Sequence, residues 1–117
     1  MKNSVIDLGI DLVQNSRIAL ANSRPGFLEK ILSDDEQIEY FHRKGKKRLE
    51  YLCGRYAAKE AIIKTLTSVT NIVPDYNTIN IVNGKYGELL VSFRGLNIKV
   101  SISHCSEYTI AEAILLA

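Results

Sequence analysis

The chain has 117 residues, of which 46% are hydrophobic, and its 15 Lys and Arg residues against 13 Asp and Glu residues give a formal net charge of +2. This length fits one domain, residues 1–117, and the near balance of charge excludes a uniformly basic protein that coats polyanions. No apolar run is long enough to cross a membrane, and Asp7 and Asp11 interrupt the apolar N-terminal segment, so we expect a cytoplasmic protein with neither a signal peptide nor a membrane partner.

The first third of the chain predicts one strand followed by two helices. Val5–Val13 is an apolar run of strand length, and Ser16–Ser23 has the composition of a short helix that is stopped by Pro25. Ser33 and Glu36 have the spacing of a capping box, in which each side chain bonds the backbone of the other. We therefore expect a second helix from residue 34 to about residue 42.

A long helix is predicted at about Lys47–Leu66, because apolar residues recur there with helical spacing. The apolar face includes Leu49, Leu52, Cys53, Tyr56, Ala57, Ile63 and Leu66. The cysteines Cys53 and Cys105 have no metal-ligand spacing, which favours free thiols in a reducing compartment. The segment Thr67–Thr78 is predicted to be a polar connection.

The last third of the chain predicts antiparallel strands. These are Ile79–Val82, Leu89–Phe93, Ile98–Ser103 and a final strand from about Glu107 to Leu116. Residues 83–87 read Asn-Gly-Lys-Tyr-Gly and predict a hairpin turn between the first two strands. This order of elements predicts an α+β fold, with a mainly antiparallel sheet packed against the long central helix.

The long helix also carries the residues with the clearest chemical pattern. Glu60 and Lys64 are four residues apart and share a helix face, and Arg55 and Lys59 have the same spacing. A carboxylate beside three cations suits a divalent cation and a phosphate bound together. The alternative is a solvated helix with ordinary ion pairs between neighbouring turns.

Two further segments have the residue types of an active site. Asp11 is an acid within the first strand, and Ser103 and His104 close the strand that precedes the last one. A hydroxyl, an imidazole and two carboxylates could converge on one site.

These segments, in this order and at this separation, resemble the holo-acyl-carrier-protein synthases, the small single-domain group of 4′-phosphopantetheinyl transferases. The matching residues are Gly9–Val13, Leu52–Ala61 with Lys64, and Ser101–His104. The resemblance implies the transfer of 4′-phosphopantetheine from coenzyme A to a serine of apo-acyl carrier protein, with release of adenosine 3′,5′-bisphosphate. Such an enzyme supports fatty acid and lipid biosynthesis.

The resemblance also implies roles for individual residues. Asp11 and Glu60 are expected to hold Mg²⁺, or alternatively Mn²⁺, because these ions prefer oxygen ligands. The expected catalytic residues are Glu60, Lys64 and His104, and either Glu60 or a metal-bound water accepts the proton of the substrate serine. The residues expected to bind coenzyme A and its phosphates are Lys46, Lys47, Arg55, Lys59, Lys64, Ser103 and His104.

The implied partner is an acidic acyl carrier protein, docked on Arg17, Arg24 and Phe27. The implied assembly is a homotrimer with active sites between subunits. The chain departs from the family pattern at Cys105, where a small hydroxyl residue is usual, and at residues 67–74, which lack the usual glycines. These departures leave open a chain that binds coenzyme A without turnover.

A non-catalytic α+β module that binds RNA is the alternative of another class. Residues 42–64 contain eight Lys or Arg residues and two Glu residues, a local charge of +6 that suits a phosphate backbone. However, Phe93 is the only aromatic residue in the three strands predicted between residues 79 and 103, and RNA-binding sheets present aromatic residues for base stacking. The module would also leave Asp11 and Glu60 unexplained, so we expect no nucleic-acid partner.

Overall fold

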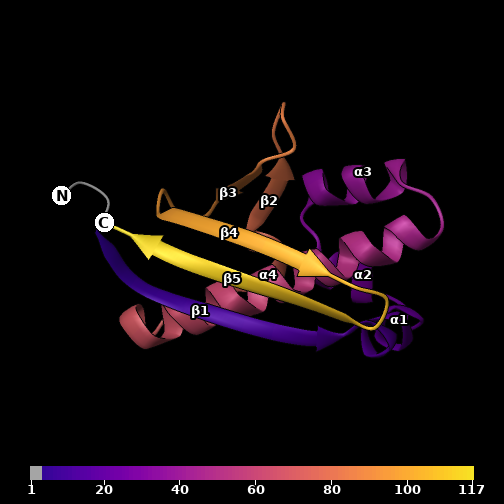
Figure 1. Ribbon diagram of the computed structural model, residues 1–117, viewed down its shortest axis with the longest axis horizontal. Helices are drawn as coiled ribbons and strands as arrows, with labels where there is room; N and C mark the ends of the chain where they lie inside the picture. Colours follow the sequence, from indigo (N-terminus) through magenta and orange to yellow (C-terminus); the bar gives the residue numbers. More distant parts are fainter. Residues whose placement is uncertain (1–3) are drawn as a thin grey trace.

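A computed structural model describes residues 4–117. Three antiparallel strands form the main sheet in the order β1-β5-β4, with β1 at Val5–Gln14, β5 at Tyr108–Leu116 and β4 at Asn97–His104. The helix α4, Lys46–Thr70, runs behind this sheet in Figure 1 and packs against β1 and β5. The α+β prediction, with an antiparallel sheet on a long helix, is confirmed.

Several of the other elements contact the middle of α4, through Arg55, Lys59 and Glu60. The other elements are α1 (Asn15–Asn22), α2 (Phe27–Ile31), α3 (Asp34–His42), the 3₁₀ turn η1 (Tyr76–Thr78), β2 (Asn80–Asn83) and β3 (Leu89–Ser92). The strands β2 and β3 pair antiparallel as the hairpin that the sequence predicts. The capping box at the start of α3 is also present, with both of its hydrogen bonds.

Two elements differ from the sequence prediction. The helix α4 continues to Thr70, because the hydroxyls of Thr67 and Thr70 donate to carbonyls of the preceding turn and so satisfy themselves within the helix. Asn71, with a φ of 59°, then ends the helix in the left-handed conformation. The five-residue helix α2 was not predicted, because its length is too short for a periodic pattern.

The strand β1 and the helix α4 approach each other closely at one glycine. A Cβ atom on Gly9 would lie 2.3 Å from the carbonyl oxygen of Ala61 and 2.6 Å from the hydroxyl of Thr65. The facing residues Ala57, Ala58 and Ala61 are fully buried and small, which permits this distance. Asp11 follows two residues after Gly9 on the same face of β1, so it also faces α4.

The main sheet buries only the face that packs on α4. On β1, alternate residues point to the other face, and Leu8, Ile10 and Leu12 are each more than half exposed. The register places Ile110 opposite Leu12, and its side chain is 39% exposed. We call these four residues the outer apolar face. The strand predicted at Val5–Val13 is therefore buried on one side only.

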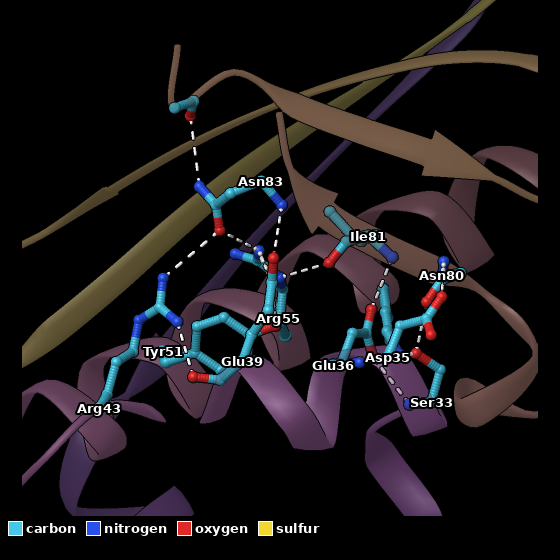
Figure 2. Close-up of polar contacts among 12 residues, drawn as sticks. Ser33, Asp35, Glu36, Glu39, Arg43, Tyr51, Arg55, Asn80, Ile81 and Asn83 are labelled. Atoms are coloured by element: carbon cyan, nitrogen blue, oxygen red, sulfur yellow. Dashed lines mark hydrogen bonds and ion pairs between the residues drawn. The ribbon is translucent and has the colours of Figure 1, made fainter. Parts of the chain in front are cut away.

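A network of polar side chains attaches β2 to α3 and α4 (Figure 2). Glu36 accepts a hydrogen bond of 2.6 Å from the backbone nitrogen of Ile81, and Glu39 accepts one of 2.9 Å from that of Asn83. The Arg55 guanidinium donates to the Ile81 carbonyl and to the Asn83 side chain, each at 2.8 Å. The hairpin is therefore tied to the helices mainly through charged groups.

Among residues 4–117, no helix has both the length and the apolar character that crossing a lipid bilayer requires.

Candidate active site

A cavity of about 260 Å³ lies between β1, α1 and α4 and contains the predicted metal ligands. Asp11 enters it from β1 and Glu60 from α4, two elements held together at Gly9. Arg17 of α1 and Phe27 of α2, two of the three predicted docking residues, line the same cavity. The structure thus brings together four predicted site residues that are far apart in the sequence.

Asp11, which lines this cavity, is paired with Lys64 of α4. The Lys64 ammonium lies 2.9 Å from Asp11 Oδ1 and donates a second hydrogen bond of 3.0 Å to the Ile10 carbonyl. The Lys64 side chain is 54% exposed, whereas that of Asp11 is 14% exposed. Lys64 therefore crosses from α4 to β1 instead of pairing with Glu60, its neighbour one turn earlier.

Glu60 is held by a hydrogen bond from a tyrosine hydroxyl, a contact that the sequence analysis did not predict. The Tyr76 hydroxyl of η1 donates to Glu60 Oε1. The ring of Tyr76 stacks on that of Tyr56, with centroids 5.7 Å apart and planes at 20°. Burial, and then the hydrogen bond to Glu60, raise the pKa of Tyr76 above its ordinary value, so Tyr76 remains a proton donor in this contact.

The residues of this cavity fit a divalent cation that is bound partly by water and substrate. Asp11 and Glu60 supply two carboxylates, and no three His, Cys, Asp or Glu residues within 4–117 are grouped so that they could hold a metal ion. Mg²⁺ commonly takes one or two carboxylates, keeps several waters and binds substrate phosphate. The donor set agrees with that mode.

A second cavity, of about 350 Å³, lies along the N-terminal half of α4. Its walls include Lys47 and His104, together with Arg43, Glu50, Asn83 and the edge of Arg55. The Nδ1 atom of His104 is 3.7 Å from a Glu50 carboxylate oxygen. Three predicted phosphate-binding residues, Lys47, Arg55 and His104, therefore border one cavity.

Ser103 and His104 point to opposite faces of the main sheet. The register places Ser103 beside Ile110 on the outer face and His104 beside the fully buried Thr109 on the inner face. Ser103 and Cys105 border a small hollow of about 210 Å³, with Leu12 and Ile110 of the outer apolar face. His104 reaches the rim of this hollow as well.

The predicted site residues do not converge within one chain. His104 contacts Glu50, which precedes Glu60 by ten residues of α4, or about 15 Å along the helix axis. The expected site residues therefore lie in two places on one copy, and the expectation that active sites form between subunits stays a prediction. One copy has a carboxylate cavity at Asp11 and a basic cavity at His104.

Lys59 cannot bind phosphate as predicted, because its ammonium is completely buried and engaged. It lies 2.5 Å from the Glu36 carboxylate and donates to the carbonyls of Ile31 at 2.7 Å and Tyr76 at 3.0 Å. Burial lowers the pKa of Lys59, and the adjacent Glu36 opposes that shift. A signal was present in the sequence: Lys59 is seven residues from both Leu52 and Leu66, which places it on the buried helix face.

Arg55 is also largely buried. Its side chain is 5% exposed, and its guanidinium bonds Ile81, Asn83 and Glu39 (Figure 2) and lies 4.2 Å from the centre of the Tyr51 ring. Arg55 therefore holds β2 and α3 against α4 and also borders the basic cavity, and its predicted phosphate contact stays a prediction. Lys46, at the first residue of α4, and Arg24, beyond the end of α1, are exposed and line neither cavity.

Comparisons with known proteins agree with this fold. The model of the 4′-phosphopantetheinyl transferase superfamily matches residues 7–115. The holo-[acyl-carrier-protein] synthases of Anoxybacillus flavithermus and Halalkalibacterium halodurans are 33% and 34% identical to the chain, over 95% of it and 95% of each relative. The crystal structure of a holo-(acyl-carrier-protein) synthase from Bacillus anthracis in complex with CoA (3′,5′-ADP) has a TM-score of 0.86 at 27% identity, and 97% of each chain is covered.

Proposed function

The chain belongs to the 4′-phosphopantetheinyl transferase superfamily, and on this basis we propose that it acts as a holo-acyl-carrier-protein synthase. It transfers 4′-phosphopantetheine from coenzyme A to a serine of apo-acyl carrier protein and releases adenosine 3′,5′-bisphosphate. The observation that carries the proposal is the approach of Asp11 and Glu60 to one cavity, in a chain similar over its length to named synthases. Both cysteines are free, which fits a cytoplasmic location.

Asp11 and Glu60 hold Mg²⁺ or Mn²⁺ in this proposal. The bound ion supplies charge neutralisation for the pyrophosphate of coenzyme A, which is the main requirement of phosphoryl transfer. Lys64, whose side chain is half exposed beside Asp11, contributes a positive charge to the pyrophosphate. The attacking hydroxyl belongs to the carrier protein, so the chain requires no nucleophile of its own.

The basic cavity binds the remaining part of coenzyme A. Lys47 and His104 border it, and Lys46 lies one residue before Lys47 at the start of α4, where helix N–H groups also favour phosphate. His104 hydrogen-bonds a phosphate oxygen from this border. Ser103 supplies a hydroxyl on the other side of β4.

A homotrimer with active sites between subunits explains why one copy separates these groups. The carboxylate cavity of one subunit and the His104 side of the next would form one site. The outer apolar face supports this arrangement, because Leu8, Ile10 and Leu12 are each more than half exposed in the single chain. An interface between different surfaces of two copies closes into a ring when the rotation is suitable.

The acidic carrier protein docks on the side of α1 and α2. Arg17 lines the carboxylate cavity and is exposed, Phe27 packs at 6.4 Å from the Tyr56 ring, and Arg24 lies in the turn between them. Positive charge at the cavity entrance attracts an acidic partner and orients it toward the reacting phosphate. The RNA-binding alternative loses support, because Arg55 and Lys59 of the basic segment are buried.

The experiment that tests this proposal is the intact mass of apo-acyl carrier protein after incubation with the chain, coenzyme A and Mg²⁺. We expect a gain of one phosphopantetheine group, abolished by a chelator and by Asp11→Asn or Glu60→Gln. If several carrier proteins show no change in mass although the chain binds coenzyme A measurably, the transferase proposal is overturned. The chain would then be a protein that binds coenzyme A without turnover.

A further inference from the structure

Tyr76 is fixed from three sides, against two residues that line the carboxylate cavity, Tyr56 and Glu60. Its carbonyl oxygen accepts a hydrogen bond of 3.0 Å from the buried Lys59 ammonium, and its ring stacks on Tyr56. Its hydroxyl donates to the Glu60 carboxylate. The backbone, ring and hydroxyl of one residue are thus each engaged by α4.

The anchor of Tyr76 is itself among the most buried groups of the chain. Lys59 and Glu36 form an ion pair in which both side chains are 0% exposed, and Glu36 also bonds the backbone of Ile81 and Ser33. The Lys59 ammonium uses its third hydrogen bond on the Ile31 carbonyl. The pair therefore ties α2, α3, β2 and η1 to α4, and the position of Tyr76 follows from the core.

We propose that Tyr76 is a positioning residue, which holds Glu60 in the orientation that binds the metal ion. The proposal rests on the proposed function, in which Glu60 is a metal ligand. A free glutamate loses the freedom of several side-chain torsions when it binds an ion, and a fixed donor removes part of that cost beforehand. Partners that hydrogen-bond a metal ligand affect metal affinity in this way in other metal sites.

The two carboxylates are prepared differently. Asp11 is paired with Lys64, whose side chain is 54% exposed and extends from the surface of α4. Glu60 is paired with a neutral hydroxyl on a segment anchored in the core. Glu60 is accordingly the preformed ligand, and a neutral donor leaves its negative charge available to a cation.

The test uses Tyr76→Phe, which retains the stacked ring and removes only the hydroxyl. Mn²⁺ binding is measured from the spin-resonance signal of free Mn²⁺, without coenzyme A or carrier protein. We expect affinity to fall about tenfold. In turnover assays, the Mg²⁺ concentration for half-maximal rate should rise by a similar factor, whereas the rate at saturating Mg²⁺ should stay close to that of the parent.

The matched control is Tyr86→Phe, which removes the hydroxyl of a tyrosine that is 83% exposed in the β2–β3 turn, and it should bind Mn²⁺ as the parent does. Glu60→Gln separates the two proposals. If Glu60→Gln weakens Mn²⁺ binding and Tyr76→Phe does not, the positioning role is overturned and the metal role of Glu60 stands. If Glu60→Gln binds as the parent does, both are overturned.

Discussion

The ammonium of Lys64 lies 2.9 Å from a carboxylate oxygen of Asp11, across the gap between α4 and β1. A cation that binds Asp11 must therefore compete with a side chain of the same protein. Lys64 is half exposed and has room to turn toward a bound phosphate, so its pairing with Asp11 in the free chain is exchangeable. Replacement of Lys64 should separate its effect on the metal ion from its effect on coenzyme A.

For Lys64→Met, we expect tighter binding of Mn²⁺ to the free protein and weaker binding of coenzyme A. The gain in metal affinity should be about twofold to fivefold, because partly exposed ion pairs contribute up to about 1 kcal/mol. Calorimetry with each ligand measures both effects. Unchanged affinity for both ligands would show that Lys64 affects neither the metal ion nor the pyrophosphate. The control is Lys85→Met, which changes an exposed lysine elsewhere.

Lys59→Met should destabilise the fold, although Met has a similar length. The change leaves the Glu36 carboxylate buried without its counter-charge, which costs about 3–5 kcal/mol when one partner of a buried pair is removed. Urea unfolding measures the loss. A variant that unfolds at the parent's urea concentration would contradict the buried charge pair.

Gly9→Ala should destabilise the protein by about 1–3 kcal/mol, because the added methyl group meets the backbone carbonyl of Ala61, which cannot move independently. It should also weaken metal binding, since Asp11 follows on the same strand. Gly84→Ala is the matched control. Its methyl group would meet only the flexible Glu88 side chain, so thermal unfolding should change little. Equal effects of both changes would argue against the close approach of β1 and α4.

The two cysteines should differ in reactivity. Burial raises the pKa of the Cys53 thiol from 9.0 to about 11, so at pH 8 about one molecule in a thousand is thiolate, whereas Cys105 is exposed. Alkylation at pH 8 should label one site quickly, and Cys105→Ser should abolish it in the folded protein. Because the pKa of Cys53 is higher in the folded state, its neutral thiol makes its full contribution to the free energy of unfolding below pH 9. That contribution is lost as the pH rises toward 11.

Ile10→Glu should prevent assembly by placing a charge on the outer apolar face. We expect native mass measurements to show trimer for the parent and monomer for the variant. Leu20→Glu alters another exposed apolar side chain, on α1, and should leave the trimer intact. A parent chain that is monomeric at micromolar concentration would refute the proposed assembly.

Much of the fold was predictable, because it depends on local signals. The capping box at Ser33 and the hairpin turn at residues 83–87 are short patterns with a direct physical meaning, and both are present. The end of α4 was misjudged because threonine disfavours helices on average, whereas Thr67 and Thr70 satisfy their hydroxyls within the helix. Tertiary context outweighed local propensity there.

The candidate site was predictable in its carboxylates but not in their surroundings. The position of Tyr76 against Glu60 depends on a connection without periodic structure, so no spacing rule could reveal it. The burial of Lys59 was predictable from its seven-residue distance to Leu52 and Leu66, but a charge pattern at four-residue spacing gave the opposite interpretation. The divergence of Ser103 and His104 also follows from the two-residue period of a strand.

The distance between His104 and Glu60 within one copy has a consequence for mixtures of variants. If neighbouring subunits share each site, two inactive proteins can repair each other: one with Asp11→Asn and one with His104→Ala. Mixed and reassembled in equal amounts, they should form about a quarter of their interfaces from two intact halves. Complementation between separate damaged copies would then follow from the separation of the two groups within each copy.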